Sequence, residues 1–318
     1  MSVAAKIGKK IIRLLSGAVD MSIVIVAMLL VAIGCYAMWD VNQVFQRANA
    51  AQYAIYKPSG EGGTLSFEEL RRINPEVFAW LTIYGTRIDY PVVHSPDNMK
   101  YINTDAMGRY SPSGAIFLDR NCDTGFTDFS SIFYGHHMEK QAMFGEIGLF
   151  ADKNYFDARE HGTLYYGGRE HGLVFFAFVH ADAYDRRVYK TKITGRENNQ
   201  AYLDLLLSLA VHTRDVQVTP DDRIVLLSTC SSSSTNGRDI LIGKITDQVY
   251  DDVFDAKTMG SEKALARVDR RPGLWPRIPL WGKAAAIGLP LLLLLPLMIQ
   301  RNRKKHGKKL PGKGVMRP

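Results

Sequence analysis

Cysteines and metal-binding patterns are scarce in this sequence. Its 318 residues include only three cysteines, at positions 35, 122 and 230, too few for the disulfide framework of a small secreted protein. The sequence has no His-Glu-x-x-His or Cys-x-x-Cys motif, no acidic triplet with calcium spacing and no glycine-rich phosphate loop. Internal repeats and low-complexity segments are also missing. We therefore expect no metal and no cofactor.

The net charge of +8 is distributed unevenly along the chain. Fourteen of the 40 Lys and Arg residues lie in segments 1–39 and 277–318, where Asp20 is the only acidic residue. The middle of the chain is mildly acidic. The positive net charge therefore comes from two basic tails, and this placement indicates a membrane topology and not nucleic-acid binding.

Two apolar runs adjoin the basic tails. The first, residues 21–38, has about the length that spans a bilayer core, and we find no good Ala-x-Ala cleavage site for it. We interpret it as an uncleaved anchor. The second, residues 280–299, contains Pro290 and Pro296 but reaches about 20 residues, with tryptophans at one edge and a basic cluster at the other. We predict a second span there; a peripheral hydrophobic hairpin is the alternative.

Between the two runs, short apolar stretches alternate with turn residues. This pattern is typical of a mainly β protein and predicts a closed β-barrel with peripheral helices. Helical periodicity predicts a polar helix at 41–56, a helix at 141–155 and an amphipathic helix at 198–211. The predicted strands are residues 80–83, 88–93, 114–118, 130–134, 162–166, 173–181, 223–229 and 240–245.

Cys230 stands at the end of the strand predicted from residue 223, a run of branched and aliphatic residues. A thiol at a strand end, next to the serine-rich loop 231–234, is placed where a nucleophile can reach a substrate. The alternative is a small core residue, the common fate of a free cysteine. Cys122 lies in an acidic loop, which keeps a thiol protonated. Cys35 lies in the first apolar run.

Two further side chains stand at strand ends. His136 and His137 follow the strand at 130–134, and Arg238 opens the strand after Cys230. A Cys-loop-Arg hairpin can fold the guanidinium over the thiol. Histidine is the usual proton carrier, and a guanidinium suits an oxyanion. Alternation sends the two histidines to opposite sides, so only one can face the thiol.

These motifs together resemble the sortases, the membrane-anchored cysteine transpeptidases of Gram-positive cell walls. Their signature is Thr-Leu-x-Thr-Cys on one strand, a histidine after glycine on an earlier strand and an arginine opening the next strand. This chain has Leu226 in place of the first Thr. Segments 73–83, 90–103 and 113–121 and the helix-bearing insert before the cysteine strand resemble class B in particular. The resemblance covers about residues 65–255.

The resemblance implies an eight-stranded closed barrel, and the two apolar runs predict a transmembrane helix on either side of it. His136, directly after glycine, matches the family's acid/base, beside Cys230 and Arg238. Substrate-contacting positions are implied at Asn98, Tyr101, Ser228 and Ser231, with His137 lining the groove or serving the structure. The expected order along the chain is a cytoplasmic basic tail (1–20), a transmembrane helix (21–39), an extracellular helix and linker (40–63), the catalytic domain (64–255), a stalk (256–279), a transmembrane helix (280–300) and a cytoplasmic basic tail (301–318).

The implied activity is cleavage of an LPxTG- or NPxTN-like sorting signal through a thioacyl intermediate. The acyl group would pass to an amine of a peptidoglycan precursor or to a pilin lysine, at the outer face of the cell membrane. Papain-like proteases place the cysteine on a helix, which this sequence does not; an L,D-transpeptidase is a further rival. A non-catalytic, membrane-tethered barrel used for adhesion or assembly is the alternative from another class.

Overall fold

The structure, a computed structural model, describes residues 3–58, 63–231 and 236–254. The chain divides into two compact units, and residues 44–254 of the described part belong to the second. The predicted stalk, the second apolar run and the C-terminal basic tail lie outside the described residues.

The first unit contains most of helix α1 (Val3–Ala48). Its segment Leu14–Gln46 is long and apolar enough to cross a membrane, and an 18-residue stretch within it has a mean hydropathy of 2.5. The predicted span at 21–39 falls within this helix. The polar helix predicted to reach residue 56 ends earlier, because Asn49 turns the chain and its side chain accepts a hydrogen bond from the Ala51 N–H.

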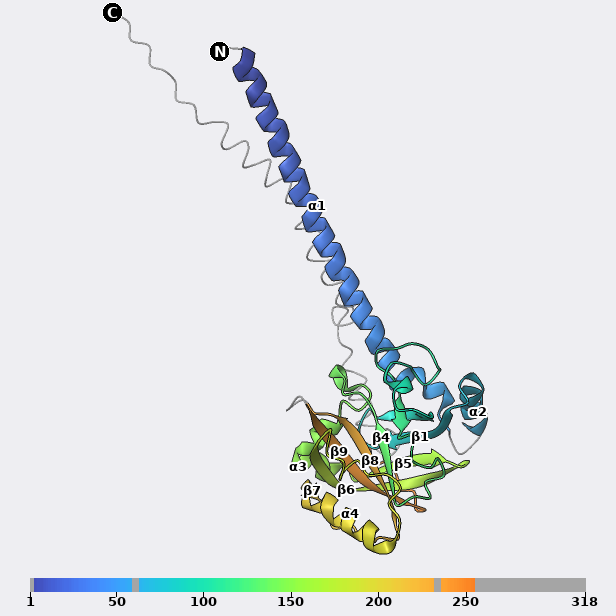
Figure 1. The fold of residues 1–318 in the computed structure, drawn as a ribbon. Coiled ribbons are helices and arrows are strands. Elements are labelled where there is room, and N and C mark those ends of the chain that lie inside the picture. The colour runs from blue at the N-terminus through green and yellow to red at the C-terminus, as the bar shows by residue number, and fades with distance from the viewer. Residues whose placement is uncertain (1–2, 59–62, 232–235, 255–318) are drawn as a thin grey trace, which may run out of the picture. The chain divides into compact units, whose positions relative to one another are not determined.

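The second unit is built around one sheet that closes on itself (Figure 1). The strand order is β5-β1-β2-β3-β4-β8-β9-β6, and pairing of β5 with β6 closes an eight-stranded barrel. This confirms the predicted mainly β fold and its closed eight-stranded barrel; of the two predicted flanking transmembrane helices, the second lies outside the described residues. The strands are β1 (Val77–Ile83), β2 (Asp89–His94), β3 (Ile116–Leu118), β4 (Ser130–Tyr134), β5 (His161–Tyr166), β6 (Arg169–Asp182), β7 (Ala210–Thr213), β8 (Arg223–Cys230) and β9 (Gly237–Thr246).

Short helices and 3-10 turns surround the barrel. They are η1 (Ala50–Gln52), η2 (Ala54–Tyr56), α2 (Gly63–Ile73), η3 (Lys100–Ile102), η4 (Glu139–Gln141), η5 (Ile147–Ala151), α3 (Lys153–Ala158) and α4 (Arg196–Ser208). Helix α4 lies along the outside of the sheet (Figure 1), where Tyr202, Leu203 and Leu206 pack on β8 and β9.

Strand β8 separates two apolar clusters. Val225 and Leu227 belong to the cluster that fills the barrel, while Ile224 and Leu226 belong to the cluster beneath α4. Because successive side chains point to opposite faces of a strand, both faces of β8 are buried. This accounts for its continuous apolar sequence. Even-numbered side chains of β8 thus point out of the barrel and odd-numbered side chains point in.

Two local predictions were wrong. The helix expected at 141–155 is instead η4, η5 and the short α3. Lys140, Gln141 and Met143 adopt positive φ, which interrupts a helix. The helix expected to reach 211 ends at Ser208, since the next residues pair with β6 as the ninth strand, β7. A four-residue strand has too short a pattern to be recognised.

Leu226 should be required for the fold rather than for the chemistry. It is fully buried beneath α4. We expect Leu226→Thr, which restores the signature residue, to cost about 2–4 kcal/mol of unfolding free energy, because it removes packing and buries a hydroxyl. Urea denaturation of the full-length chain in detergent measures this cost. Leu207→Thr, on the half-exposed side of α4, is the matched control and should cost less than about 1 kcal/mol; equal costs would contradict the assignment.

Candidate active site

Cys230 is the last residue of β8 and its only exposed one. The six residues before it are buried, so the apolar strand fixes the backbone while its last side chain reaches solvent. By alternation with Leu226 and Ser228, Cys230 points away from the barrel interior. The structure thus places the predicted nucleophile at an accessible, rigidly supported strand end.

Arg238 lies directly across from Cys230. Strands β8 and β9 are antiparallel, and Cys230 and Arg238 are Cα partners in their ladder. Directly opposed residues project from the same face of a sheet, with Cβ atoms about 4.5–5.5 Å apart. The half-buried Arg238 donates from Nη1 to the Gly237 carbonyl at 3.0 Å. The predicted hairpin therefore brings the guanidinium to the thiol's side of the sheet.

His136 comes to the same place through parallel pairing of β4 with β8. Tyr134 is the Cα partner of Ser228, and the Gly135 N–H donates to the Ser228 carbonyl at 3.2 Å. Two residues further along each strand are His136 and Cys230. Alternation from Tyr134 directs His136 to the face that carries Cys230.

The imidazole of His136 is held by a backbone carbonyl. Its Nε2 lies 2.8 Å from the Ile102 oxygen. Because a carbonyl only accepts hydrogen bonds, we assign the proton of the neutral ring to Nε2. Nδ1 is then the nitrogen left to exchange a proton with a reacting group.

Ser228 lies on the same face as Cys230, two residues before it, and contacts a residue that the sequence did not single out. The Ser228 Oγ lies 2.9 Å from the hydroxyl of Tyr189 in the loop between β6 and α4. Burial raises the pKa of Tyr189 to about 12, so it stays protonated at neutral pH. No motif surrounds Tyr189, and only the folded loop reveals that it flanks the thiol's face.

Asn98 is connected to this face through Asp119. Its Nδ2 donates to Asp119 at 2.8 Å, its Oδ1 accepts from the Arg120 N–H at 2.8 Å, and the hydroxyl of Tyr134 donates to the same Asp119 at 3.1 Å. Both ends of the Asn98 amide are thus engaged within the protein. Its predicted contact with substrate remains a prediction.

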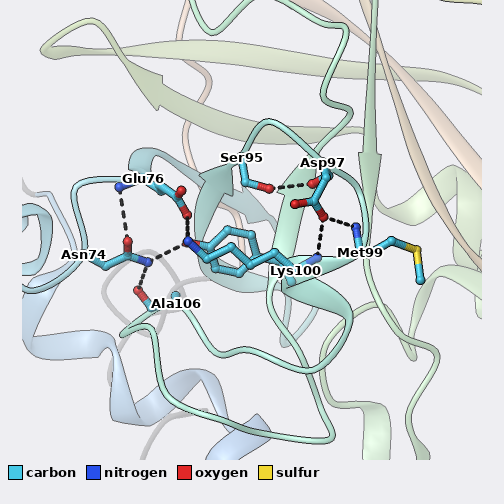
Figure 2. Close-up of polar contacts among 8 residues, drawn as sticks. Asn74, Glu76, Ser95, Asp97, Met99, Lys100 and Ala106 are labelled. Atoms are coloured by element: carbon cyan, nitrogen blue, oxygen red, sulfur yellow. Dashed lines mark hydrogen bonds and ion pairs between the residues drawn. The ribbon is translucent and has the colours of Figure 1, made fainter.

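Tyr101 does not fit its predicted place in the substrate groove. Its side chain is 1% exposed, and its hydroxyl donates to Glu76 and accepts from Asn74. Lys100 adds an ion pair to Glu76 at 2.6 Å. Figure 2 shows Asn74, Glu76 and Lys100 joined at one end of this loop, and Asp97 accepting from the backbone at the other. We conclude that Tyr101 anchors the Asn98 loop.

His137 lies on the other side of the sheet from Cys230. A Cβ added to Gly148 of η5 would lie 2.9 Å from Asp239 Oδ2 and 3.9 Å from His137 Cε1. Asp239 pairs with Thr229 and therefore belongs to the inner face. His137 fits the structural alternative and does not line the thiol's face. Alternation predicted the separation of the two histidines.

Ser231 begins the β8–β9 loop, where its N–H donates to the Gly237 carbonyl at 2.8 Å and closes the hairpin. Its predicted contact with substrate remains a prediction. Cys122 is buried, and burial raises the pKa of its thiol to about 11, which makes it a poor nucleophile. Within the described ranges, no three His, Cys, Asp or Glu side chains gather into a possible metal site.

Strand pairing and alternation therefore direct a thiol, an imidazole and a guanidinium to one face of the sheet, at or just beyond neighbouring strand ends of a closed barrel. The thiol can attack a carbonyl, the imidazole can carry the proton and the guanidinium can stabilise the oxyanion. Fold and site define a cysteine-dependent acyl-transfer enzyme.

Comparison with known proteins specifies the family, although no family model matches the chain. Sortase B of Listeria monocytogenes is 32% identical over 180 residues, covering 56% of this chain and 72% of that protein. Sortase B from the type II pilus of Streptococcus pneumoniae is 47% identical, with a TM-score of 0.51, over 57% of this chain and 99% of that one. A Streptococcus pyogenes class B sortase involved in pilus biogenesis is 36% identical, with a TM-score of 0.52, over 56% and 97%. The chain belongs to the class B sortases and is a cysteine transpeptidase.

The two histidines should differ sharply in function. We expect His136→Ala to lower kcat by about 10²- to 10⁴-fold, the usual contribution of a general acid or base. His137→Ala, the neighbouring control on the opposite face, should keep a substantial fraction of turnover. Cleavage of fluorogenic sorting-signal peptides measures both, with thermal melts to check folding. Equal losses in two folded variants would refute the assignment by strand alternation.

Proposed function

We propose that this enzyme cleaves a sorting signal of the LPxTG or NPxTN kind after its threonine and transfers the acyl group to an amine. The observation that supports the proposal is the register of β4, β8 and β9: Arg238 is the Cα partner of Cys230, and Tyr134, two residues before His136, is the Cα partner of Ser228, two residues before Cys230. Sorting-signal-bearing surface proteins or pilins are the proposed substrates.

In the first half of the reaction, the Cys230 thiolate attacks the threonine carbonyl carbon. The carbonyl oxygen gains negative charge, which the Arg238 guanidinium stabilises with a planar pair of donors. The thiol proton of Cys230 has by then passed to Nδ1 of His136, and the tetrahedral intermediate expels the amine of the next residue, which takes this proton from the His136 imidazolium. The C–N bond is broken and a thioester joins the threonine to Cys230.

In the second half, an incoming amine attacks the thioester carbonyl. His136 accepts the proton that this amine loses, Cys230 leaves as a thiolate, and a new amide bond forms. Two similar solved structures, 47% and 36% identical in sequence, are sortases of a type II pilus and of pilus biogenesis. This likeness favours a pilin lysine as the acceptor. An amine of a peptidoglycan precursor is the alternative acceptor, and attack by water would give hydrolysis.

We also propose that the enzyme is a two-pass membrane protein with its catalytic domain on the extracellular face. The apolar segment Leu14–Gln46 of α1 and the two basic tails support this topology. The second span, at 280–300, rests on the sequence alone.

The proposed reaction predicts a covalent intermediate on Cys230. Full-length enzyme incubated with LPxTG and NPxTN peptides should gain the mass of the fragment that ends in threonine. Mass spectrometry of the Cys230 peptide detects this adduct. Cys122→Ala is the matched control and should form the adduct normally, whereas Cys230→Ala should form none.

The preferred acceptor can be identified from the amine that reacts with the thioester on Cys230. A pilin-derived lysine peptide and a peptidoglycan stem-peptide amine can be supplied separately, and the ligated product identifies the preferred amine. If no peptide of either motif acylates folded wild-type enzyme, the proposed substrate class is wrong.

The topology predicts where protease can reach the chain. A tag inserted at residue 60 should be digested on intact protoplasts, because the segment lies outside the membrane, while tags at both termini should be protected. Immunoblots before and after detergent lysis measure this. Digestion of the C-terminal tag on intact protoplasts would rule out the second span.

A further inference from the structure

A second pair of titratable side chains lies directly behind the proposed catalytic residues. In the adjoining β8–β9 and β9–β6 ladders, Cys230, Arg238 and Ala181 form one row. The next row is Thr229, Asp239 and His180. Because neighbouring rows point to opposite faces, His180 and Asp239 lie on the inner face, one residue from the thiol and the guanidinium.

The pair is joined by a short hydrogen bond. His180 Nδ1 lies 2.7 Å from Asp239 Oδ1, with the Asp239 side chain 4% exposed and that of His180 45% exposed. A carboxylate buried to this extent is costly unless it is paired and hydrogen-bonded. His180 therefore supplies the partner that allows Asp239 to face inward.

The surroundings of Asp239 are closely packed on the remaining side. Gly148 of η5 leaves no room for a side chain, since its Cβ would lie 2.9 Å from Asp239 Oδ2. The ring of His180 packs edge-on against Phe178, with centroids 5.0 Å apart. Both members of the pair are thus held by neighbours that the proposed reaction does not use.

The start of β9 is joined to both neighbouring strands by backbone pairing, including the Ser231 N–H to the Gly237 carbonyl at 2.8 Å, but it lacks apolar side chains of its own. Gly237, Arg238 and Asp239 precede the first apolar residue of the strand, Ile240. A one-residue slip would move every side chain to the other face. It would replace the guanidinium beside Cys230 with a carboxylate, which repels a thiolate.

We propose that His180 and Asp239 form a positioning pair, whose hydrogen bond fixes the first residues of β9 against β6 and so holds Arg238 beside Cys230. This rests on the proposed roles of Cys230 and Arg238. Neither member of the pair reaches the thiol's face, and both act through Arg238.

The position of Arg238 can be measured without a substrate. Iodoacetate and iodoacetamide both alkylate the Cys230 thiolate, but only iodoacetate is anionic. Both reagents react with the same thiolate, so the thiolate fraction cancels in the ratio of their rate constants. The ratio therefore reports how strongly a nearby positive charge attracts the anionic reagent. Mass spectrometry of the Cys230 peptide, from the full-length chain in detergent at low salt, gives both rates and separates them from alkylation of Cys122.

Arg238→Ala sets the scale of the experiment. It should lower the iodoacetate-to-iodoacetamide ratio by about fivefold, as expected for loss of a unit charge about 4 Å away in water. His180→Ala should lower the ratio by about threefold, from partial displacement of the guanidinium in the same field. His180→Ala added to Arg238→Ala should cause no further decrease, because the effect passes through Arg238.

Three variants separate positioning from charge and from general stability. His180→Asn keeps an N–H donor for Asp239 without the imidazole's charge, and its ratio should stay near wild type. His180→Phe keeps the ring on Phe178 but loses the hydrogen bond, and it should behave as His180→Ala, which preserves the test if the alanine variant does not fold. His212→Ala removes another histidine hydrogen bond from a strand paired with β6, and should leave the ratio unchanged.

The outcomes distinguish failure of the positioning role of His180 and Asp239 from failure of the proposed active site. A normal ratio in folded His180→Ala and His180→Phe, with a reduced ratio in Arg238→Ala, would overturn the positioning role and leave the proposed active site intact. Independent, multiplicative effects in the double variant would also overturn it. No change in Arg238→Ala would remove Arg238 from the thiol's vicinity, and both proposals would fail.

Discussion

The parallel pairing of β4 with β8 is the constraint on which the site depends. The two strands are separated by almost a hundred residues of sequence, yet their register, with Tyr134 opposite Ser228, decides which side chain reaches Cys230. A parallel pair cannot be joined by a short turn. The connecting chain must therefore fold into β5, β6 and α4, and these elements close the barrel. The histidine and the thiol meet only because the whole barrel is assembled.

Because side chains alternate along β8, its two faces differ in what they contact. Leu226 secures the outer face under α4, Ser228 contacts Tyr189, and Cys230 emerges where the covering helix no longer reaches. On the inner face, buried apolar residues give way at the same level to a polar row with Asp239. The Thr229 hydroxyl and His137 Nδ1 are both buried without a hydrogen-bond partner in the part of the chain described. Such polar groups are costly in a core, and these two lie close to the level of the thiol.

The strands could be predicted from the sequence, because their apolar runs and turn residues are local signals. The nucleophile and the arginine were also predictable, since a short hairpin connects them and fixes their pairing. Tyr101 was assigned to the substrate side, but its direction depends on a contact with Glu76 that no local pattern encodes. For His137 the sequence left both a groove-lining and a structural role open, and its contact with η5 favours the structural one. Tyr189 was missed because its contact with Ser228 exists only in the folded chain, and β7 because four residues make too short a pattern. Periodicity shows that successive side chains of a strand point to opposite faces. Which residues each side chain then contacts depends on the element that packs against that face.

The tertiary partners also explain why position 226 accepts a leucine in place of the signature threonine, while a substitution of Asp239 should disturb the site. Both residues are buried, and both lie within a few positions of the proposed catalytic groups. Leu226 is surrounded by apolar side chains from α4 and β9, so its requirement is for volume. Asp239 is surrounded by a histidine and the backbone of η5, so its requirement is for charge and geometry. Apolar packing tolerates substitution by residues of similar volume, whereas a buried carboxylate that loses its hydrogen-bond partner is left uncompensated. The rigidity of β9 near Arg238 therefore depends on a polar contact, in a barrel that is otherwise held by apolar ones.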